Sequence, residues 1–301
     1  MPSRSYKHTD EHTDEGIGVD QAVHDLDYAY FQRKVLSLTG IDLRNYKAGQ
    51  MRRRLGTLVQ RAGVRTFAEY AALLERDPRR RQEFEDFFTI NVSEFFRDPQ
   101  RFEQLRAKIL PELARSGMVL RVWSAGCSIG AEPYSLAMLL DDAGLAGRAS
   151  ILATDIDART LERARRGEGY LPSEVRCVPP RYLERYFTVS DGTYAVVPSI
   201  RRMVQFRQHD LLSDPFERNF DLIVCRNVVI YFTDVAKERL YQKFWEALRP
   251  GGYLFLGGTE VLSRAQELGF EPRATAFYRK IAPAGAQAWS PVREWAGRGV
   301  R

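Results

Sequence analysis

The chain has 301 residues, which is longer than a usual single domain. Hydrophobic residues make up 44% of it, which is enough for a sizeable core. The formal net charge is +6, no run of eighteen apolar residues occurs, and the polar N-terminus lacks the apolar segment of a secretory signal. We therefore expect a soluble, cytoplasmic protein of two domains without membrane insertion, and the widely spaced Cys127, Cys177 and Cys225 favour neither disulfides nor a metal site.

The N-terminal part of the chain divides into two stretches. Residues 1–18 contain the tandem sequence HTDEHTDE without apolar periodicity, and we expect a disordered extension there. Residues 19–87 have a helical pattern and predict an all-helical domain. The positive charge is concentrated at 44–81, a stretch that contains eleven Lys or Arg but only three Asp or Glu. Such a basic module predicts an acidic partner, which could be nucleic acid, a membrane surface or a carboxylate-rich protein.

The stretch MRRRLGTLVQRAG predicts an amphipathic helix within this domain. At 100° per residue, four apolar residues share one face: Met51, Leu55, Leu58 and Val59. Arg53 points directly away from that face, and Arg54 and Arg61 lie on one flank. The helix should pack on its apolar side. Its arginines then form either a solvated face or a binding surface.

Beyond residue 120, short apolar runs alternate with helical stretches, which predicts a parallel sheet covered on both faces. The predicted strands are the runs RVWSA, SILATDI, VQFRQHD, FDLIVCRNV and GGYLFLGG. A helix is expected at 234–249, stopped by RPGG. Around 178–203, short strands flank an Asp-Gly turn and predict a small antiparallel insertion. The fold class is α/β, and the Ala-, Gly- and Pro-rich tail at 282–301 is expected to be disordered.

A turn after the first predicted strand is a candidate ligand site. Gly126 and Gly130 lack a Cβ, so a ligand could approach the backbone at the start of the next helix, although a plain packing role explains them equally well. Asp155 ends the second predicted strand, where its carboxylate could accept both ribose hydroxyls. The GxGxxG fingerprint is absent and the fourth strand ends in polar residues. These observations favour S-adenosylmethionine over a dinucleotide.

Four motifs in order, NVSEFFRDPQRFEQL, VWSAGCSIGAEPYSLAM, ATDID and CRNVVIYF, resemble the CheR family. These are S-adenosylmethionine-dependent methyltransferases that esterify glutamate side chains on bacterial chemotaxis receptors, and the resemblance spans roughly residues 20 to 281. It implies a helical domain at 19–87, a cofactor-contacting linker at 88–119 and a Rossmann-like, doubly wound methyltransferase domain at 120–281 that carries the insertion.

The resemblance, together with the glycine turn, predicts the cofactor-binding residues. They are Asn91, Ser93, Arg97, Gly126, Glu132, Asp155, Asp210, Leu211, Arg226 and Asn227. Ser93 stands where threonine is usual and keeps the hydroxyl. Asp210 stands where asparagine is usual and loses the side-chain donor, which puts a contact through that side chain in doubt, whereas backbone contacts could survive. Without the resemblance, Glu132 would be interpreted as a first-turn acid, and Asn91 and Ser93 as a local cap.

The resemblance also implies that Arg97 and Tyr231 are the catalytic residues, which lie beside the transferable methyl group and orient the incoming carboxylate. A glutamate with a pKa near 4.3 is protonated in only about one molecule in 500 at pH 7, so it needs no base. A lysine acceptor would need help with deprotonation. His209 is interpreted as a strand-end residue and not as a catalyst.

Receptor docking is expected at the N-terminal domain. The resemblance implies a contact with the acidic, cytoplasmic helical domain of the receptors, and the predicted substrate-binding residues are Arg52, Arg53, Arg54 and Arg61. Some family members also bind a receptor tail pentapeptide by strand addition to the insertion, and the sequence leaves this open here.

Alternative functions come from different classes. The basic region could serve a nucleic-acid methyltransferase, but the end of the fourth strand lacks the Asp/Asn-Pro-Pro-aromatic motif, so no nucleic-acid partner is expected. Methylation of other proteins, or a non-catalytic cofactor-binding signalling scaffold, are the remaining alternatives.

Overall fold

The structure is a computed structural model that describes residues 15–88, 93–115 and 119–281. It forms two compact units, residues 1–90 with 231–235 and residues 91–230 with 236–301. The predicted tail lies outside the described residues, as does the predicted extension except for its last four residues, which begin helix α1. Within the described ranges, no helix combines the length and the apolar character that a membrane span requires.

The first unit is helical. Its elements are α1 (Glu15–Thr39), η1 (Leu43–Asn45), α2 (Ala48–Arg61), α3 (Phe67–Arg76) and α4 (Pro78–Phe88). The predicted packing face of α2 is confirmed, because all four of its apolar residues are buried. Phe31 of α1 contacts the rings of Tyr70 and Phe84, so aromatic side chains hold three helices together. Asp27 accepts two backbone N–H groups at the start of α3, at 2.9 and 2.8 Å, and thereby fixes α3 on α1.

The second unit is built on a seven-stranded sheet in the order β5-β2-β1-β6-β7-β9-β8. Its strands are β1 (Leu120–Ala125), β2 (Ala149–Asp155), β5 (Val204–Gln208), β6 (Phe220–Cys225), β7 (Leu248–Leu256), β8 (Phe270–Ala274) and β9 (Phe277–Lys280). The first five are the predicted strands, and they pair in parallel. The sequence did not predict β8 and β9, which pair antiparallel and make the sheet mixed.

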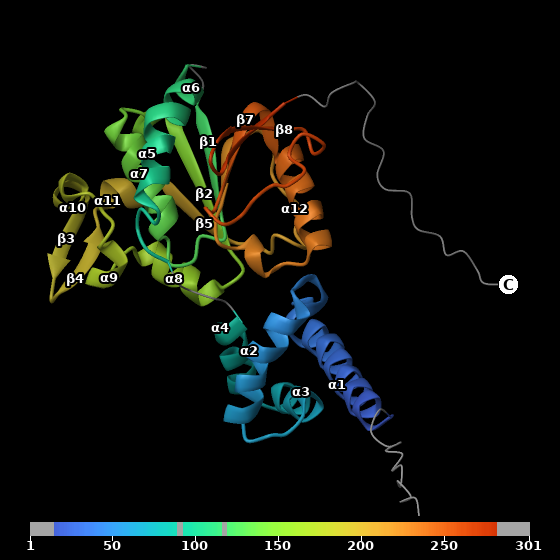
Figure 1. The fold of residues 1–301 in the computed structure, drawn as a ribbon. Coiled ribbons are helices and arrows are strands. Elements are labelled where there is room, and N and C mark those ends of the chain that lie inside the picture. Colours follow the sequence, from blue (N-terminus) through green and yellow to red (C-terminus); the bar gives the residue numbers. More distant parts are fainter. Residues whose placement is uncertain (1–14, 89–92, 116–118, 282–301) are drawn as a thin grey trace, which may run out of the picture. The chain divides into compact units, whose positions relative to one another are not determined.

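Helices cover both faces of this sheet (Figure 1). The helical elements are α5 (Pro99–Gln104), η2 (Leu105–Ile109), α6 (Leu110–Ala114), α7 (Ala131–Asp142), η3 (Ala146–Arg148), α8 (Ala158–Arg166), α9 (Pro172–Val175), α10 (Pro180–Tyr186), α11 (Pro198–Arg201), η4 (Val229–Tyr231) and α12 (Asp234–Ala247). Neighbouring side chains of β1 point to opposite faces, as strand geometry requires. Val122 joins the core that includes α7, and Trp123 contacts Phe244 of α12.

Helix α12 ends at Ala247, two residues before the predicted end, so the prediction of a helix to 249 is wrong. Leu248 already pairs with Phe220 at the start of β7. Lys280 Nζ donates to the carbonyl of Trp245 in the last turn of the helix at 2.6 Å and to that of Leu248, just after the helix, at 2.7 Å. Sheet pairing and this lysine therefore end the helix before RPGG is reached.

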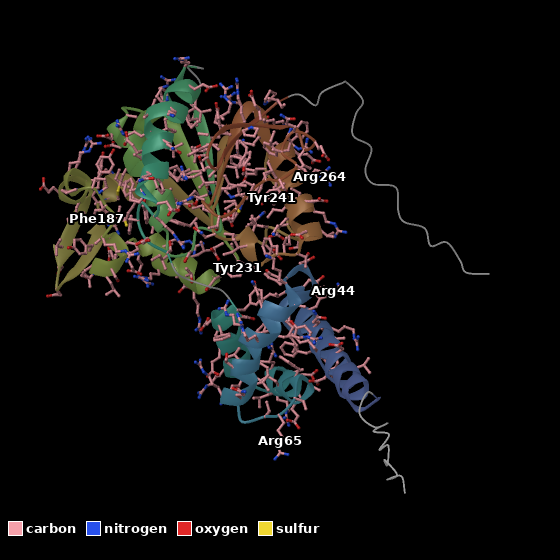
Figure 2. The ribbon with its side chains drawn as sticks, viewed as in Figure 1. Arg44, Arg65, Phe187, Tyr231, Tyr241 and Arg264 are labelled. Carbon is pink, nitrogen blue, oxygen red and sulfur yellow. The ribbon has the colours of Figure 1, made fainter. Side chains whose placement is uncertain are left out.

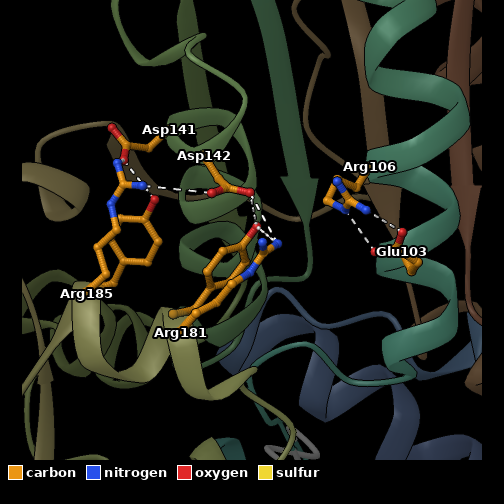
Figure 3. A network of polar contacts seen from close by, with 8 residues as sticks. Glu103, Arg106, Asp141, Asp142, Arg181 and Arg185 are labelled. Atoms are coloured by element: carbon orange, nitrogen blue, oxygen red, sulfur yellow. Dashed lines mark hydrogen bonds and ion pairs between the residues drawn. The ribbon is translucent and has the colours of Figure 1, made fainter.

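The predicted antiparallel insertion is the hairpin of β3 (Phe187–Ser190) and β4 (Thr193–Val196). The ring of Phe187, labelled in Figure 2, lies 5.0 Å from that of Phe95. The preceding α10 is attached to the end of α7, as Figure 3 shows. Asp141 accepts from Arg185 at 2.7 Å, and Asp142 accepts from the Tyr182 hydroxyl at 2.6 Å. The insertion is thus fixed to a helix that covers the sheet.

Candidate functional site

The turn after β1 lies at the carboxyl ends of the parallel strands. Gly126 and Gly130 have φ values of 85° and 84°, a left-handed conformation that favours glycine. A Cβ on Gly126 would lie 2.5 Å from Cγ2 of Val228, and one on Gly130 would lie 3.0 Å from Cβ of Ala164. Packing alone therefore requires both glycines. The same tight turn brings its backbone to the end of β2.

Asp155 ends β2 beside this turn. Its Oδ2 accepts the N–H of Ser128 at 2.7 Å, and its Oδ1 accepts the N–H of Asp157 at 3.0 Å. Burial raises the pKa of the Asp155 carboxyl above its ordinary value, and the backbone hydrogen bonds oppose this only in part. A carboxylate has about four acceptor positions, so Asp155 keeps capacity for the hydroxyl groups of a ribose.

Glu132 and Arg226 form an ion pair at the ends of β1 and β6. Arg226 Nη1 lies 3.7 Å from Glu132 Oε2, and the two side chains are 2% and 14% exposed. Ser124 Oγ donates to Glu132 Oε1 at 2.8 Å. Burial raises the pKa of the Glu132 carboxyl, while the charge of Arg226 and the Ser124 hydroxyl lower it. Glu132 is therefore a first-turn acid of α7 and also part of a buried charged cluster.

Arg226 also holds the segment that precedes α5. Its Nη2 donates to the carbonyl of Arg97 at 2.9 Å and to Oδ2 of Asp98 at 2.5 Å. In the same segment, the N–H of Phe96 donates to Oγ of Ser135 in α7 at 2.9 Å. Phe96 and Asp98 have φ values of 52° and 62°, which strain a residue other than glycine. These contacts bring Arg97 to the cluster, where its charge lowers the pKa of Glu132.

The other two predicted linker residues are placed differently. Asn91 lies outside the described residues. Ser93 is partly exposed, and the N-cap of the following helix α5 is Asp98 and not Ser93. The interpretation of Asn91 and Ser93 as a local cap stays a prediction.

The loop after β5 carries Asp210 and the buried Leu211. Asp210 Oδ1 accepts the N–H of Leu212 at 2.8 Å, and its Oδ2 accepts from the hydroxyl of Ser213 at 3.0 Å. Both carboxylate oxygens of Asp210 thus accept hydrogen bonds from residues of its own loop. A ligand contact at this position would fall on the backbone.

His209 begins the same loop and is buried. Its ring lies 5.7 Å from that of Trp123 and 5.5 Å from that of Phe216. Burial lowers the pKa of this imidazole, although the charge of Asp214 acts in the opposite direction. A neutral, packed ring agrees with the interpretation of His209 as a strand-end residue.

Asn227 and Tyr231 follow β6 in the chain. Asn227 is partly exposed and has a φ of 60°. Tyr231, labelled in Figure 2, ends η4 and clusters with the helical unit, where its carbonyl accepts the N–H of Lys47 at 3.0 Å. The second unit therefore brings together the glycine turn, Asp155 and the Glu132–Arg226 pair, but Tyr231 is not part of that unit.

The four arginines predicted to bind substrate differ in exposure. Arg52 and Arg54 are partly buried, and their guanidinium groups lie over aromatic rings at 4.5 and 4.9 Å from the ring centres. Arg53 and Arg61 are thus the arginines of α2 that are exposed, although the guanidinium of Arg61 also lies 5.8 Å from the ring centre of Phe87.

Sequence analysis missed Glu260, which lies just after β7. Its side chain is buried and accepts backbone N–H groups from two loops at the carboxyl ends of the strands. The only local signal was an acid two residues after the glycine pair GG, and nothing in that pattern shows its distant partners.

The sheet and the site define the class of protein. A glycine turn after the first strand and a carboxylate after the second are typical of α/β proteins that bind a nucleoside-containing cofactor at the carboxyl ends of parallel strands. The side chains fit such a group, because Asp155 has acceptor capacity for ribose hydroxyls and Glu132 offers a carboxylate to an ammonium group.

Comparison with known proteins identifies the family. Residues 26–89 match the CheR methyltransferase all-alpha domain, and residues 91–277 match the CheR methyltransferase SAM binding domain. A chemotaxis protein methyltransferase of Listeria monocytogenes is 42% identical over 255 residues, covering 84% of this chain and 97% of the relative. Chemotaxis protein methyltransferase 1 of Pseudomonas aeruginosa is 36% identical over 248 residues, covering 79% and 90%. The chain belongs to the CheR methyltransferase family and binds S-adenosylmethionine as its cofactor.

Proposed function

We propose that this protein transfers a methyl group from S-adenosylmethionine to glutamate side chains of chemotaxis receptors and forms methyl esters. The supporting observation is that the cofactor end of the sheet combines carboxylates with arginines, while His209, the histidine of the described second unit, is engaged in packing. A carboxylate acceptor is already ionised at neutral pH and requires no base. When bound, S-adenosylmethionine supplies an electrophilic methyl group on a sulfonium.

The cofactor would be held by two partly buried carboxylates. Asp155 would accept the ribose hydroxyls, and Glu132 would accept from the ammonium group of the methionine part. The backbone at Asp210 and Leu211 would contact the base, because the Asp210 side chain is engaged in its own loop. Arg226 would act mainly by holding Glu132 and the segment of Arg97 in place.

Arg97 and Tyr231 would position the acceptor. A guanidinium of Arg97 can hold one carboxylate oxygen by a charge-assisted hydrogen bond, and the Tyr231 hydroxyl can orient the other. Methyl transfer requires an in-line nucleophile about 3 Å from the methyl carbon, so orientation is the main contribution that such residues make.

The receptor would be recognised in the cytoplasm through α2. Its exposed Arg53 and Arg61 suit the acidic helical domain of a receptor, and Arg52 and Arg54 would support them from the flank. Opposite charges on the two partners should speed their encounter, and salt should weaken it, because the Debye length is about 8 Å at physiological ionic strength.

The hairpin of β3 and β4 is the place where a receptor tail pentapeptide would bind. Tyr194 of β4 pairs with Val189 of β3 on one side and with Tyr170 on the other. Strand β4 is therefore covered on both sides, and β3 forms the outer edge. A short peptide would add as a strand to β3, and calorimetry with a synthetic receptor tail would test this part of the proposal.

The reaction is tested with radiolabelled S-adenosylmethionine and receptor-containing membranes from the protein's own source. Label that mild base releases as methanol would support the proposal, whereas base-stable label would indicate methylation of nitrogen or carbon and refute it. Labelling of nucleic acid would favour the alternative enzyme class. Asp155→Asn serves as the control variant, because it should lose labelling together with cofactor affinity.

A further inference from the structure

The carboxylate of Glu260 is almost entirely buried and accepts three hydrogen bonds from backbone N–H groups. Its Oε2 accepts the N–H of Asn227 at 2.9 Å and that of Gly257 at 2.7 Å, and its Oε1 accepts the N–H of Val229 at 3.1 Å. The residue is 4% exposed. Buried carboxylates are rare unless they are paired in this way, because their desolvation is costly. We call this set of contacts the Glu260 anchor.

The Glu260 anchor connects the ends of two neighbouring strands. Asn227 and Val229 belong to the loop after β6, and Gly257 directly follows β7. The N–H of Glu260 itself donates to the carbonyl of Gly257 at 3.0 Å, so the carboxylate is carried on a closed turn. The anchor therefore fixes the loop after β6 relative to the rigid centre of the sheet.

The loop that the anchor holds is strained at Asn227. A φ of 60° is left-handed; asparagine adopts this conformation more readily than most residues other than glycine, but it still favours contacts that hold the backbone there. The N–H of Asn227 donates to Glu260, so the acceptor acts on the strained residue itself. Without it, the peptide could relax and turn the Asn227 side chain away.

Gly257 lies directly against the carboxylate of Glu260, so that no room is left for a side chain. A Cβ at this position would lie 2.6 Å from Oε2 of Glu260 and 3.1 Å from the N atom of Asn227. A side chain there would displace the acceptor or the loop. The neighbouring Gly258 is exposed, and a Cβ on it would meet nothing within 4 Å. The two adjacent glycines thus form a matched pair for testing the Glu260 anchor.

We propose that Glu260 is a positioning residue, whose carboxylate sets the backbone of the loop after β6 and so places Asn227 for the cofactor. The inference rests on the proposed function, within which Asn227 is one of the cofactor-binding residues that the resemblance to the CheR family predicts. Glu260 acts through Asn227, because its own oxygens are occupied by backbone N–H groups.

The first test compares Glu260→Gln with Asp221→Asn in the full-length chain. Asp221 is also 4% exposed and accepts the N–H of Arg121 at 2.7 Å, but it lies at the other end of β6. Each substitution replaces a buried carboxylate by the amide of nearly the same shape. An amide NH₂ among three converging N–H donors leaves at least one of them facing another donor. Both variants should therefore lower the melting temperature.

Affinity and turnover separate the two variants. Glu260→Gln should weaken S-adenosylhomocysteine binding about tenfold and lower kcat at saturating cofactor about tenfold or more. Asp221→Asn should change both by less than twofold. If Glu260→Gln loses thermal stability but binds the product and turns over like the wild type, Glu260 is only structural and the proposal is overturned.

The second test perturbs the anchor from the opposite side. Gly257→Ala should weaken S-adenosylhomocysteine binding as Glu260→Gln does, whereas Gly258→Ala should leave it unchanged. In the double variant Glu260→Gln/Gly257→Ala, the two losses of affinity should not add, because both changes disturb the same set of contacts. Equal affinities of the two alanine variants would overturn the proposal even if Glu260→Gln fails to fold.

Binding of S-adenosylhomocysteine requires no receptor. If wild-type protein methylates nothing at glutamate, the proposed function fails, but the calorimetric comparison still decides whether Glu260 places Asn227. If receptor methylation is found and the affinities are insensitive to the anchor, only the inference about Glu260 fails.

Discussion

Replacing Asp155 by asparagine tests the cofactor site most directly. The carboxylate is expected to accept ribose hydroxyls, and a charge-assisted hydrogen bond is worth about 1.5–3 kcal/mol against about 0.5–1.5 kcal/mol for a neutral one. Loss of the charge should therefore cost about 1 kcal/mol for each of two hydroxyls, or about 30-fold in affinity. Calorimetric titration with S-adenosylhomocysteine measures this directly.

The same substitution also disturbs the turn, so a matched control is needed. The N–H of Ser128 or that of Asp157 would face the amide NH₂, and this should lower the free energy of unfolding by about 1–3 kcal/mol. Asp157→Asn removes the same charge two residues away, at an N-cap position where asparagine is equally suitable. It should leave the affinity unchanged. An Asp155→Asn variant that binds within twofold of wild type would refute the ribose assignment.

The raised pKa of Asp155 predicts opposite pH dependences for stability and for binding. Because burial raises the folded-state pKa above 3.8, folding takes up a proton between the unfolded and folded pKa values, and this group favours the folded state as pH falls through that window. Cofactor binding needs the carboxylate. The affinity should therefore begin to fall at a pH higher than an ordinary aspartate would cause, and Asp155→Asn should remove the contribution of Asp155 to this acid limb. Glu132, whose pKa burial also raises, should produce the part that remains, and an acid limb of unchanged size in the variant would contradict the assignment to Asp155.

Three further predictions concern the receptor surface, the acceptor and the turn. Arg53→Glu should slow receptor methylation about tenfold at low salt without changing cofactor affinity, and an unchanged rate would remove α2 from the docking model. Tyr231→Phe should lower kcat about tenfold or more at unchanged cofactor affinity, whereas lost affinity would indicate a cofactor contact. Gly126→Ala should lower both the melting temperature and the cofactor affinity, because its Cβ would lie 2.5 Å from Val228. The control Gly144→Ala, at a φ of 70° with nothing within 4 Å of the added Cβ, should lower only the melting temperature. Equal cofactor affinities of the two variants would contradict this prediction.

Local patterns predicted the parallel part of the sheet, because short apolar runs and glycine turns are encoded over a few residues. The same reasoning placed Asp155 beside the glycine turn, since the ends of adjacent parallel strands meet at one edge of the sheet. The antiparallel strands β8 and β9 were missed. They are 5 and 4 residues long, and β8 carries Pro272, which weakens a strand pattern.

Long-range polar contacts could not be predicted from such patterns. Arg226 holds Asp98 across 128 residues, and Glu260 holds Asn227 across 33. A buried carboxylate and an exposed one look the same in a sequence, because their environment is set by elements that fold from elsewhere in the chain. The resemblance to the CheR family supplied Arg226 and Asn227 as candidates, but it did not supply what holds them.

The strained residues around the cofactor site show why these contacts matter. Phe96, Asp98, Ser128 and Asn227 are non-glycine residues with positive φ that lie around the cofactor site at this end of the sheet. Each is held by a polar side chain from another element. Such a conformation costs about 1–3 kcal/mol, and a hydrogen bond to a charged group contributes about 1.5–3 kcal/mol, so the contacts with Arg226, Asp155 and Glu260 can offset the strain that they fix. The Ser135 hydroxyl at Phe96 is neutral and contributes about 0.5–1.5 kcal/mol.

Exposure then separates the two carboxylates that act in this way. Asp155 is partly exposed and can serve a ligand as well as its turn, whereas Glu260 is 4% exposed and serves the backbone alone. Substitution of Asp155 should therefore act on the cofactor directly and change the acid limb of binding. Substitution of Glu260 should act through geometry, and its effect should be reproduced by Gly257→Ala, which leaves every charge in place.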